Sequence, residues 1–422
     1  MKGDQFLMAL DAALESGYFC TDELHELQLT CLSVCVECRN RYYFNLKIME
    51  EASLQLLEHD YQQRARGRGK ASRVPLPRIC EVTWQFEGLE LVENTFVNTG
   101  SHITLQHLRF GKWFRQAVDG VTWPVGLQEL TFGDVFNVEV EGVVWPTELV
   151  RLTFGRCFNQ TISGVVWPTG LQQLTFGEDF DQDVEGVVWP SALQQVTFGR
   201  RFDREVGGVA WPTGLQQLTF GRDFDQMISG VVWPTGLQQL SFGDEFNQDV
   251  EGVVWPASLQ QLTFGRSFNQ PVGEVLWPAG LQQLAFGDEF DRELEGVVWP
   301  TGLQELTLGG DRPVHGITWP DGLKRLNFGN RFGQVIDGVE WPARLEELTF
   351  GWRFNQAIDG VEWPAELKQL SFGWEFNQSI YGVEWPAGLQ QLSLGPNFTH
   401  TLDRGSLPAG LKVIFRLNNT FY

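Results

Sequence analysis

The feature that most constrains the fold is a 22-residue phrase that repeats from Leu105 to the C-terminus. A clean copy runs from Leu237 to Ser258 and reads LQQLSFGDEFNQDVEGVVWPAS, and positions are numbered here from its first residue. Copies begin at Leu105, Leu127, Leu149, Leu171, Leu193, Leu215, Leu237, Leu259, Leu281, Leu303, Leu323, Leu345, Leu367, Leu389 and Leu411. The step is 22 except between Leu303 and Leu323, where two residues are missing. One copy has too little apolar surface to fold alone, so neighbouring copies must share a continuous core, as in a solenoid.

Each copy has a pattern that predicts one short strand and several corners. Leu240 and Phe242 alternate with a polar residue, which is the period of a strand with one buried face. Position 7 is glycine in every full copy, which indicates positive φ or a close backbone approach at the turn out of the strand. Trp255-Pro256 predicts the last corner before the next strand, because proline is hard to place within a sheet.

The string Leu-x-x-Leu-x-Phe-Gly-x-x-Phe-Asn-Gln, followed by Trp-Pro or Leu-Pro, resembles the FNIP repeat, a relative of the leucine-rich repeat. Phe268-Asn269-Gln270-Pro271-Val272 nearly spells the motif that gives that family its name, and Leu407-Pro408 has its usual Leu-Pro. The resemblance covers about three quarters of the chain and implies a solenoid that binds proteins. The chain departs from the family in having Trp where Leu is usual and an acidic residue where Pro is common.

Position 11 is Asn or Asp in most copies. The column comprises Asn137, Asn159, Asp181, Asp203, Asp225, Asn247, Asn269, Asp291, Asn355 and Asn377. Both side chains suit turns and hydrogen-bond nearby backbone, so we interpret the column as a structural ladder. The alternative, a row of metal ligands, is disfavoured because Asn and Asp interchange and no further acids recur in a fixed frame.

Charge is concentrated on the repeats. The chain of 422 residues has a net charge of -22, and residues 1–80 hold ten Lys/Arg and eleven Asp/Glu, so -21 lies beyond them. That charge repels nucleic acid and favours a basic protein partner, although it is equally suited to solubility alone. No apolar run is long enough to span a membrane, no signal peptide is evident, and six scattered Cys form no disulfide framework. We expect an intracellular, cytoplasmic protein that does not bind membranes.

The first 104 residues fall into three segments. Residues 1–63 have apolar spacings of three and four, which predict a small helical domain with a last helix from Phe44 to Tyr61. The stretch Tyr18–Leu24 and the apolar residues after it resemble the second half of an F-box, which implies a ubiquitin-ligase adaptor as partner. Residues 64–80 form a basic, Gly- and Pro-containing segment, which is either an exposed linker or a nuclear-import patch. Residues 81–104 are expected to form a degenerate capping coil before the solenoid of residues 105–422.

No pattern of residues points clearly to catalysis or to a cofactor. Cys31, Cys35 and Cys38 have the spacing of an iron–sulfur cluster motif, but they share one face of a predicted helix, where Cys usually acts as a small apolar residue. The adjacent acids Asp244-Glu245 fall at turn positions 8 and 9, where solvent is the expected surrounding. We therefore expect a protein that is not an enzyme and has no metal or cofactor.

Two sets of residues are candidates for binding a protein. Position 3 of the repeat falls in the predicted strand, on the face that is the usual binding surface of a leucine-rich-repeat solenoid. It is Gln in six consecutive copies, Gln173, Gln195, Gln217, Gln239, Gln261 and Gln283. Near the C-terminus, Trp352-Arg353 and Trp374-Glu375 occupy positions 8 and 9 of consecutive copies, a composition typical of interaction hot spots. The alternative for the tryptophans is a local stack on the solenoid. Position 8 also alternates in charge along most copies, which suggests attraction between neighbouring coils.

The sequence as a whole predicts a mainly β fold, a single elongated leucine-rich-repeat-like solenoid with a small α-helical N-terminal domain. The expected function is a non-enzymatic protein-interaction scaffold, and the F-box resemblance implies a substrate receptor of a cullin-type ubiquitin ligase. The alternative is an acidic structural or decoy rod that binds basic proteins. A third alternative, an enzyme that uses the Cys31 cluster, would be revealed by iron or zinc in purified protein.

The strand phase can be tested by two truncations in one coil. Phe242→Ala should destabilise the protein by about 3–5 kcal/mol, because it removes a buried aromatic ring. Gln239→Ala, on the opposite face of the strand, should change the free energy of unfolding by less than about 0.5 kcal/mol. Both values should come from the same spectroscopic probe of denaturant unfolding, since a repeat array need not unfold in two states. Equal effects would show that the strand phase is wrong by one residue.

Overall fold

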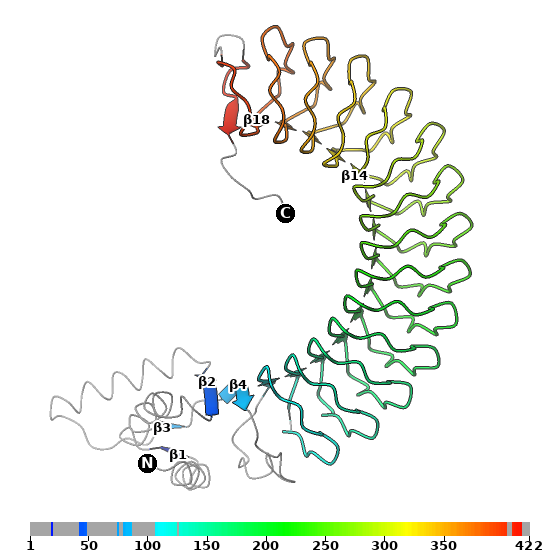
Figure 1. Ribbon diagram of the computed structural model, residues 1–422, viewed down its shortest axis with the longest axis vertical. Coiled ribbons are helices and arrows are strands. Elements are labelled where there is room, and N and C mark those ends of the chain that lie inside the picture. The colour runs from blue at the N-terminus through cyan, green and yellow to red at the C-terminus, as the bar shows by residue number, and fades with distance from the viewer. Residues whose placement is uncertain are drawn as a thin grey trace, which may run out of the picture. The chain divides into compact units, whose positions relative to one another are not determined.

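The computed structural model describes residues 106–124, 126–402 and 407–415, together with four short strands before them at 18–19, 42–48, 74–75 and 79–86. The chain divides into two compact units, Met1–Gly199 and Arg200–Tyr422. Each unit contains a parallel sheet built from the same repeated coil (Figure 1).

The described residues of the first unit contain nine strands. β1 (Tyr18–Phe19) pairs with β3 (Val74–Pro75), and β2 (Tyr42–Ile48) pairs with β4 (Ile79–Phe86), both antiparallel. A parallel sheet continues from β4 through β5 (His107–Phe110), β6 (Glu129–Thr131), β7 (Arg151–Thr153), β8 (Gln173–Thr175) and β9 (Gln195–Thr197). Each repeat strand therefore pairs with the same positions of the next copy.

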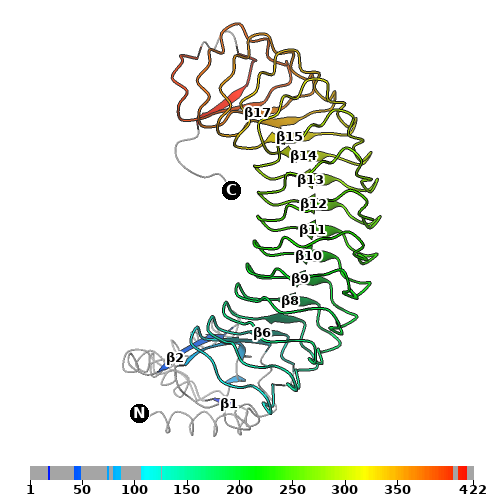
Figure 2. The same cartoon turned by 45° about the vertical axis from the view of Figure 1, so that its right-hand side comes forward.

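The described residues of the second unit contain ten parallel strands, and Figure 2 shows β10 to β15 side by side. They are β10 (Gln217–Thr219), β11 (Gln239–Ser241), β12 (Gln261–Thr263), β13 (Gln283–Ala285), β14 (Glu305–Leu308), β15 (Arg325–Phe328), β16 (Glu347–Thr349), β17 (Gln369–Ser371), β18 (Gln391–Leu394) and β19 (Lys412–Phe415). The register follows the repeat, with Leu240 opposite Leu262 and Leu262 opposite Leu284. The predicted mainly β, leucine-rich-repeat-like solenoid of 22-residue coils is confirmed.

The segments before the repeats differ from two expectations. The helix expected from Phe44 to Tyr61 does not begin there, because Tyr42–Ile48 is strand β2. The signal for the strand is the alternation of Phe44, Leu46 and Ile48 with polar residues in an aromatic-rich run, which is a period of two. The basic linker 64–80 likewise includes β3 and the start of β4, where β-branched residues favour strand. The rest of the expected helical domain, with its cysteine cluster and most of the F-box-like stretch, lies outside the described residues.

The core consists of columns of identical side chains. In one coil Leu237, Leu240, Phe246 and Val250 are almost fully buried, and Phe242 is 5% exposed. Aromatic rings stack both within a coil and between coils. Phe242 and Phe246 have ring centroids 4.2 Å apart, and Phe246 lies 6.1 Å from its equivalent Phe268. The Trp-Pro tryptophans form a further column, buried or half-buried, in which Trp255 and Trp277 stack at 6.3 Å.

Three turns close the coil that begins at Leu237, and each is fixed by a backbone hydrogen bond. Phe246 N–H donates to the Gly243 carbonyl, Val253 N–H to Val250, and Leu259 N–H to Pro256. The first and last are the expected corners at position 7 and at Trp-Pro. The middle turn has Gly252 at a φ of 74°, a conformation that suits glycine.

The invariant glycine at position 7 serves close approach rather than positive φ. A Cβ placed on Gly265 would lie 1.7 Å from the Gly243 carbonyl oxygen of the preceding coil. Equivalent distances elsewhere are 1.6–2.1 Å, except at Gly329, which follows the short coil. The two backbones meet at this corner, and no other amino acid leaves room for that approach.

The column at position 11 is the predicted structural ladder. The Asn247 side-chain oxygen accepts the backbone N–H of Asn269 at 2.8 Å and the side-chain amide of Gln270 at 3.1 Å. Asp225 does the same for Asn247 and Gln248, at 2.8 and 3.0 Å. One carboxylate or amide oxygen thus satisfies two donors of the next coil, which explains why Asn and Asp interchange here.

Opposite charges at position 8 meet across neighbouring coils in several places. Arg156 lies 3.0 Å from Glu178, and Arg222 lies 3.8 Å from Asp244. All four side chains are largely exposed, so each pair contributes about 0–1 kcal/mol and is screened by salt. These exposed pairs therefore add little to the free energy of unfolding, and a role for the alternation in disfavouring mis-stacked coils stays a prediction.

Gly265→Ala should be strongly destabilising, by about 3 kcal/mol or more, because the new methyl group would overlap backbone that cannot move aside. Gly273→Ala in the same coil is the matched control. It has ordinary φ and no atom within 4 Å of its missing Cβ, so it should change the unfolding free energy by less than about 0.5 kcal/mol. Denaturant titration of both variants measures the difference. A tolerated Gly265→Ala would mean that the coils do not approach as closely as described.

Asn247→Ala removes the acceptor of two donors and should cost about 1–3 kcal/mol, the usual penalty for leaving buried donors unsatisfied. Asn247→Asp preserves the accepting oxygen and should unfold within about 1 kcal/mol of the parent. Thermal and denaturant unfolding of the two variants checks this. If the Asp variant were as unstable as the Ala variant, the ladder would not depend on that oxygen.

Candidate protein-binding surfaces

Position 3 of each repeat, the first residue of most of the strands, places a row of side chains on the outer face of the sheet. In the second unit Gln217, Gln239, Gln261 and Gln283 are directly opposite one another in register. All are half-buried, while the leucine that follows each of them is buried. Parallel strands lie about 4.8 Å apart, so the four amides form one continuous row. In the first unit Gln173 and Gln195 are paired in the same way.

A second row, at position 5, widens this face. It consists of Thr219, Ser241, Thr263 and Ala285, each two residues beyond a glutamine on the same side of the strand. Neither row carries a charge between β10 and β13. The face therefore offers amide and hydroxyl donors and acceptors without a charge to desolvate, which suits a partner that presents polar backbone or side chains.

Position 3, which holds the glutamines up to β13, is occupied by charged residues in β14 and β15. These charged side chains pair with one another. Arg325 donates to Glu305 from Nε at 3.0 Å and from Nη2 at 2.7 Å, and this hydrogen bond raises the pKa of Arg325. In the first unit His107 lies 2.6 Å from Glu129, which also pairs with Arg151. These side chains neutralise one another across strands and bound the uncharged glutamine rows.

The two C-terminal tryptophans form a stacked pair. The rings of Trp352 and Trp374 are 5.1 Å apart and inclined by 16°, so the local stack weighed as the alternative is present. Trp352 nevertheless remains 40% exposed, and Arg353 and Glu375 are exposed beside the pair. The pair is both a packing element and an accessible aromatic surface, and its role in binding stays a prediction.

The described residues show no arrangement typical of a catalytic or metal site. Within them no group of three or more His, Cys, Asp or Glu is placed to hold a metal ion. The Asp244-Glu245 pair lies in a turn, with Arg222 3.8 Å from Asp244 and 3.5 Å from Glu245. His315 and His400 hydrogen-bond backbone carbonyls of neighbouring coils, and Cys157 is half-buried with a pKa raised by burial.

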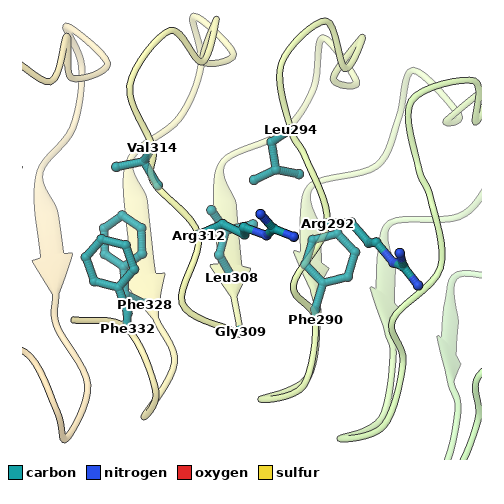
Figure 3. Close-up of a pocket in the computed structure, with 9 residues that line it drawn as sticks. All are labelled: Phe290, Arg292, Leu294, Leu308, Gly309, Arg312, Val314, Phe328 and Phe332. Carbon is teal, nitrogen blue, oxygen red and sulfur yellow. The ribbon is translucent and has the colours of Figure 1, made fainter. Parts of the chain in front are cut away.

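A small cavity marks the short coil (Figure 3). The two residues missing between Leu303 and Leu323 include the phenylalanine of position 10, so the aromatic column jumps from Phe290 to Phe332. Leu308 and Val314 line the gap with these rings. Sequence comparison of the copies would have located this gap. Its two polar lining residues, Arg292 and Arg312, donate from Nε to the backbone carbonyls of Asn269 and Asp291 at 2.7 and 3.1 Å. We therefore interpret the cavity as the result of a deletion in the core rather than as a ligand site.

One surface feature was missed from the sequence. Valines at position 18, such as Val232 and Val254, are 77% and 81% exposed, although the valine before each and the tryptophan after each are buried. The signal was present as the alternation within Val-Val-Trp, which places the second valine on the opposite side from its neighbours.

Comparisons with known proteins agree with the fold. No protein-family model and no curated protein matches this chain. The chain is similar to the crystal structure of CroV588, described as a novel circular LRR protein, with a TM-score of 0.61 and 33% identity over 78% of this chain and 55% of that one. It therefore spans about half the length of that protein. An internalin (inlF) from Listeria monocytogenes matches with a TM-score of 0.47 and 15% identity, over 67% of this chain and 84% of that one.

The part of the chain that the structure describes contains no apolar helix of membrane-spanning length. CroV588, with a TM-score of 0.61, is described as a leucine-rich-repeat protein. The fold of the repeats is accordingly leucine-rich-repeat-like.

Proposed function

We propose that the protein is a non-enzymatic interaction scaffold whose uncharged strand face binds a protein partner. The observation that carries this proposal is the in-register glutamine row of β10 to β13. Side chains that the fold does not bury, repeated in line on a rigid sheet, present a preorganised surface, and preorganisation lowers the entropic cost of binding. Solenoids with such faces commonly serve as extended binding surfaces.

The resemblance of the repeats to FNIP repeats and of residues 18–31 to an F-box supports a more specific role. In that role the N-terminal segment engages a ubiquitin-ligase adaptor, and the solenoid presents a substrate to a cullin-type ligase. The protein would then act inside the cell, in the cytoplasm or, through the basic segment 64–80, in the nucleus. Trp352 and Trp374, with Arg353 and Glu375, are proposed as a second contact region for the same substrate.

Affinity capture with the full chain, quantified by mass spectrometry, tests the strand face. Gln239→Arg with Gln261→Arg adds charge to the row without straining the fold, because Arg151 and Arg325 occupy the same position in other coils. Met227→Arg with Thr235→Arg is the control, with the same added charge at exposed positions elsewhere. We expect the strand-face variant to lose a bound partner by about tenfold or more, as for hot-spot changes, while the control retains it.

Loss of partners from both variants, or from neither, would contradict binding by the strand face. Recovery of a cullin adaptor with the parent chain would support the ligase role independently. Its absence would remove that role while leaving the strand-face proposal intact.

A further inference from the structure

A row of aliphatic side chains stands exposed on the second unit, away from the strand face. It comprises Val232, Val254, Leu276 and Val298, which are 77%, 81%, 86% and 76% exposed. All four are at position 18, and the residues before and after each of them are buried, apart from the half-buried Trp277. We call these four residues the aliphatic stripe.

The four side chains form one surface rather than four isolated groups. The neighbouring tryptophan column gives the spacing of the coils on this side, with Trp233 to Trp255 at 6.4 Å and Trp255 to Trp277 at 6.3 Å. At that spacing consecutive aliphatic side chains adjoin. Contiguous exposed apolar surface of this kind is uncommon on proteins that have no partner for it.

The fold does not require aliphatic residues at position 18. Later coils of the same unit have Thr318 and then Glu340, Glu362 and Glu384 there, and the three glutamates are exposed in the same way. A position that accepts Thr and Glu is not selected for packing within the coil. Packing within the coil therefore does not explain why position 18 is Val or Leu in the four coils from Val232 to Val298.

The stripe lies in an acidic surround. Positions 13–22 of the coils from residue 205 to residue 302 carry six acids and no Lys or Arg, namely Glu205, Asp249, Glu251, Glu274, Glu293 and Glu295. The arginines of these coils are at positions 8, 9 and 12 instead, where Arg222 and Arg266 pair with acids of the next coil. The field around the stripe is therefore negative.

We propose that the aliphatic stripe is a docking site for a basic amphipathic helix of a protein partner, distinct from the strand face. Residues i and i+4 of a helix are about 6.0 Å apart along its axis, close to the coil spacing, so one apolar residue per turn can contact each coil. Lys and Arg on one flank of that helix would face the acids, which lie at positions 13, 15 and 16, on one side of the stripe.

Two other occupants fit less well. In an extended peptide with alternating apolar and basic residues, the basic side chains would point away from the acidic surface. A second copy of this chain would bring the acids around one stripe against those around the other, and like charges in an interface are unfavourable.

The probe is a fluorescein-labelled peptide of about 14 residues, LKKLLKLLKKLLKL, long enough to span the four coils as a helix. Its binding to the full chain is measured by fluorescence anisotropy at about 150 mM salt. The variant Val254→Thr with Leu276→Thr removes apolar surface without changing charge. We expect it to weaken binding by about tenfold, which corresponds to the loss of roughly 1.4 kcal/mol.

Matched controls separate docking from charge attraction. A peptide of the same composition with its amphipathic pattern scrambled should bind at least about tenfold more weakly to the parent chain. Glu251→Gln with Glu295→Gln should also weaken binding and reduce its dependence on salt. Val298→Glu, which copies the residue of later coils, is a second stripe variant and should bind less peptide despite its added attraction for lysine.

The proposal is overturned if the Thr variant and Val298→Glu bind the peptide as tightly as the parent, or if the scrambled peptide binds equally well. Either result would show attraction by charge alone. Sedimentation of the parent and the Thr variant gives a further check. A dimer of the parent that dissociates in the Thr variant would assign the stripe to self-association and would also overturn it.

Discussion

The backbone contact at position 7 sets the conditions for the rest of the structure. Where Gly265 meets the Gly243 carbonyl, two coils approach until no Cβ fits between them. With that corner fixed and the strand hydrogen bonds in place, each residue lies over its equivalent in the next coil. The aromatic columns, the Asn/Asp ladder at position 11 and the exposed rows therefore all follow the same coil-to-coil register. A repeat protein gains stability from such nearest-neighbour contacts, so one geometric constraint repeated many times determines the array.

The repeat made most of the fold predictable, because a period in sequence becomes a column in space. The strand at Gln239–Ser241, the buried Phe242, the corner at Trp255-Pro256 and the ladder at Asn247 all followed from one copy. The reason for the glycine at position 7 could not be decided, since positive φ and close approach leave the same signal in one sequence. Before the repeats, with no second copy to compare, a period of two around Phe44 was mistaken for a helix.

The surfaces were harder to predict than the core, because exposed positions vary without a packing rule. Only the uniformity from Gln173 to Gln283 in the sequence indicates the glutamine row, and the structure shows its members in register within each unit without showing what binds them. The aliphatic stripe was overlooked, since valine within Val-Val-Trp suggests core until its exposure is known. A repeat determines which positions are buried and which are exposed. The partner must be inferred from the chemistry of the exposed side chains.

In the tryptophan column, a residue that is unfavourable in a single coil becomes favourable when neighbouring coils repeat it. The buried indole Nε1 of Trp233, Trp255 and Trp277 has no hydrogen-bond acceptor, and an unsatisfied buried donor costs about 1–3 kcal/mol. Leucine at the same corner, as in Leu407, buries no donor. The indole offsets this cost by its large apolar area, by stacking on the equivalent ring, and by meeting the phenylalanine of the next coil edge to face, as Trp255 does with Phe264 at 81°. Stacking on an equivalent ring requires that the adjoining coil also have tryptophan, so the residue is most useful where it is repeated. The same dependence on neighbours explains why the short coil, in which position 10 is deleted and position 6 is Leu308 instead of phenylalanine, leaves a cavity without ending the array.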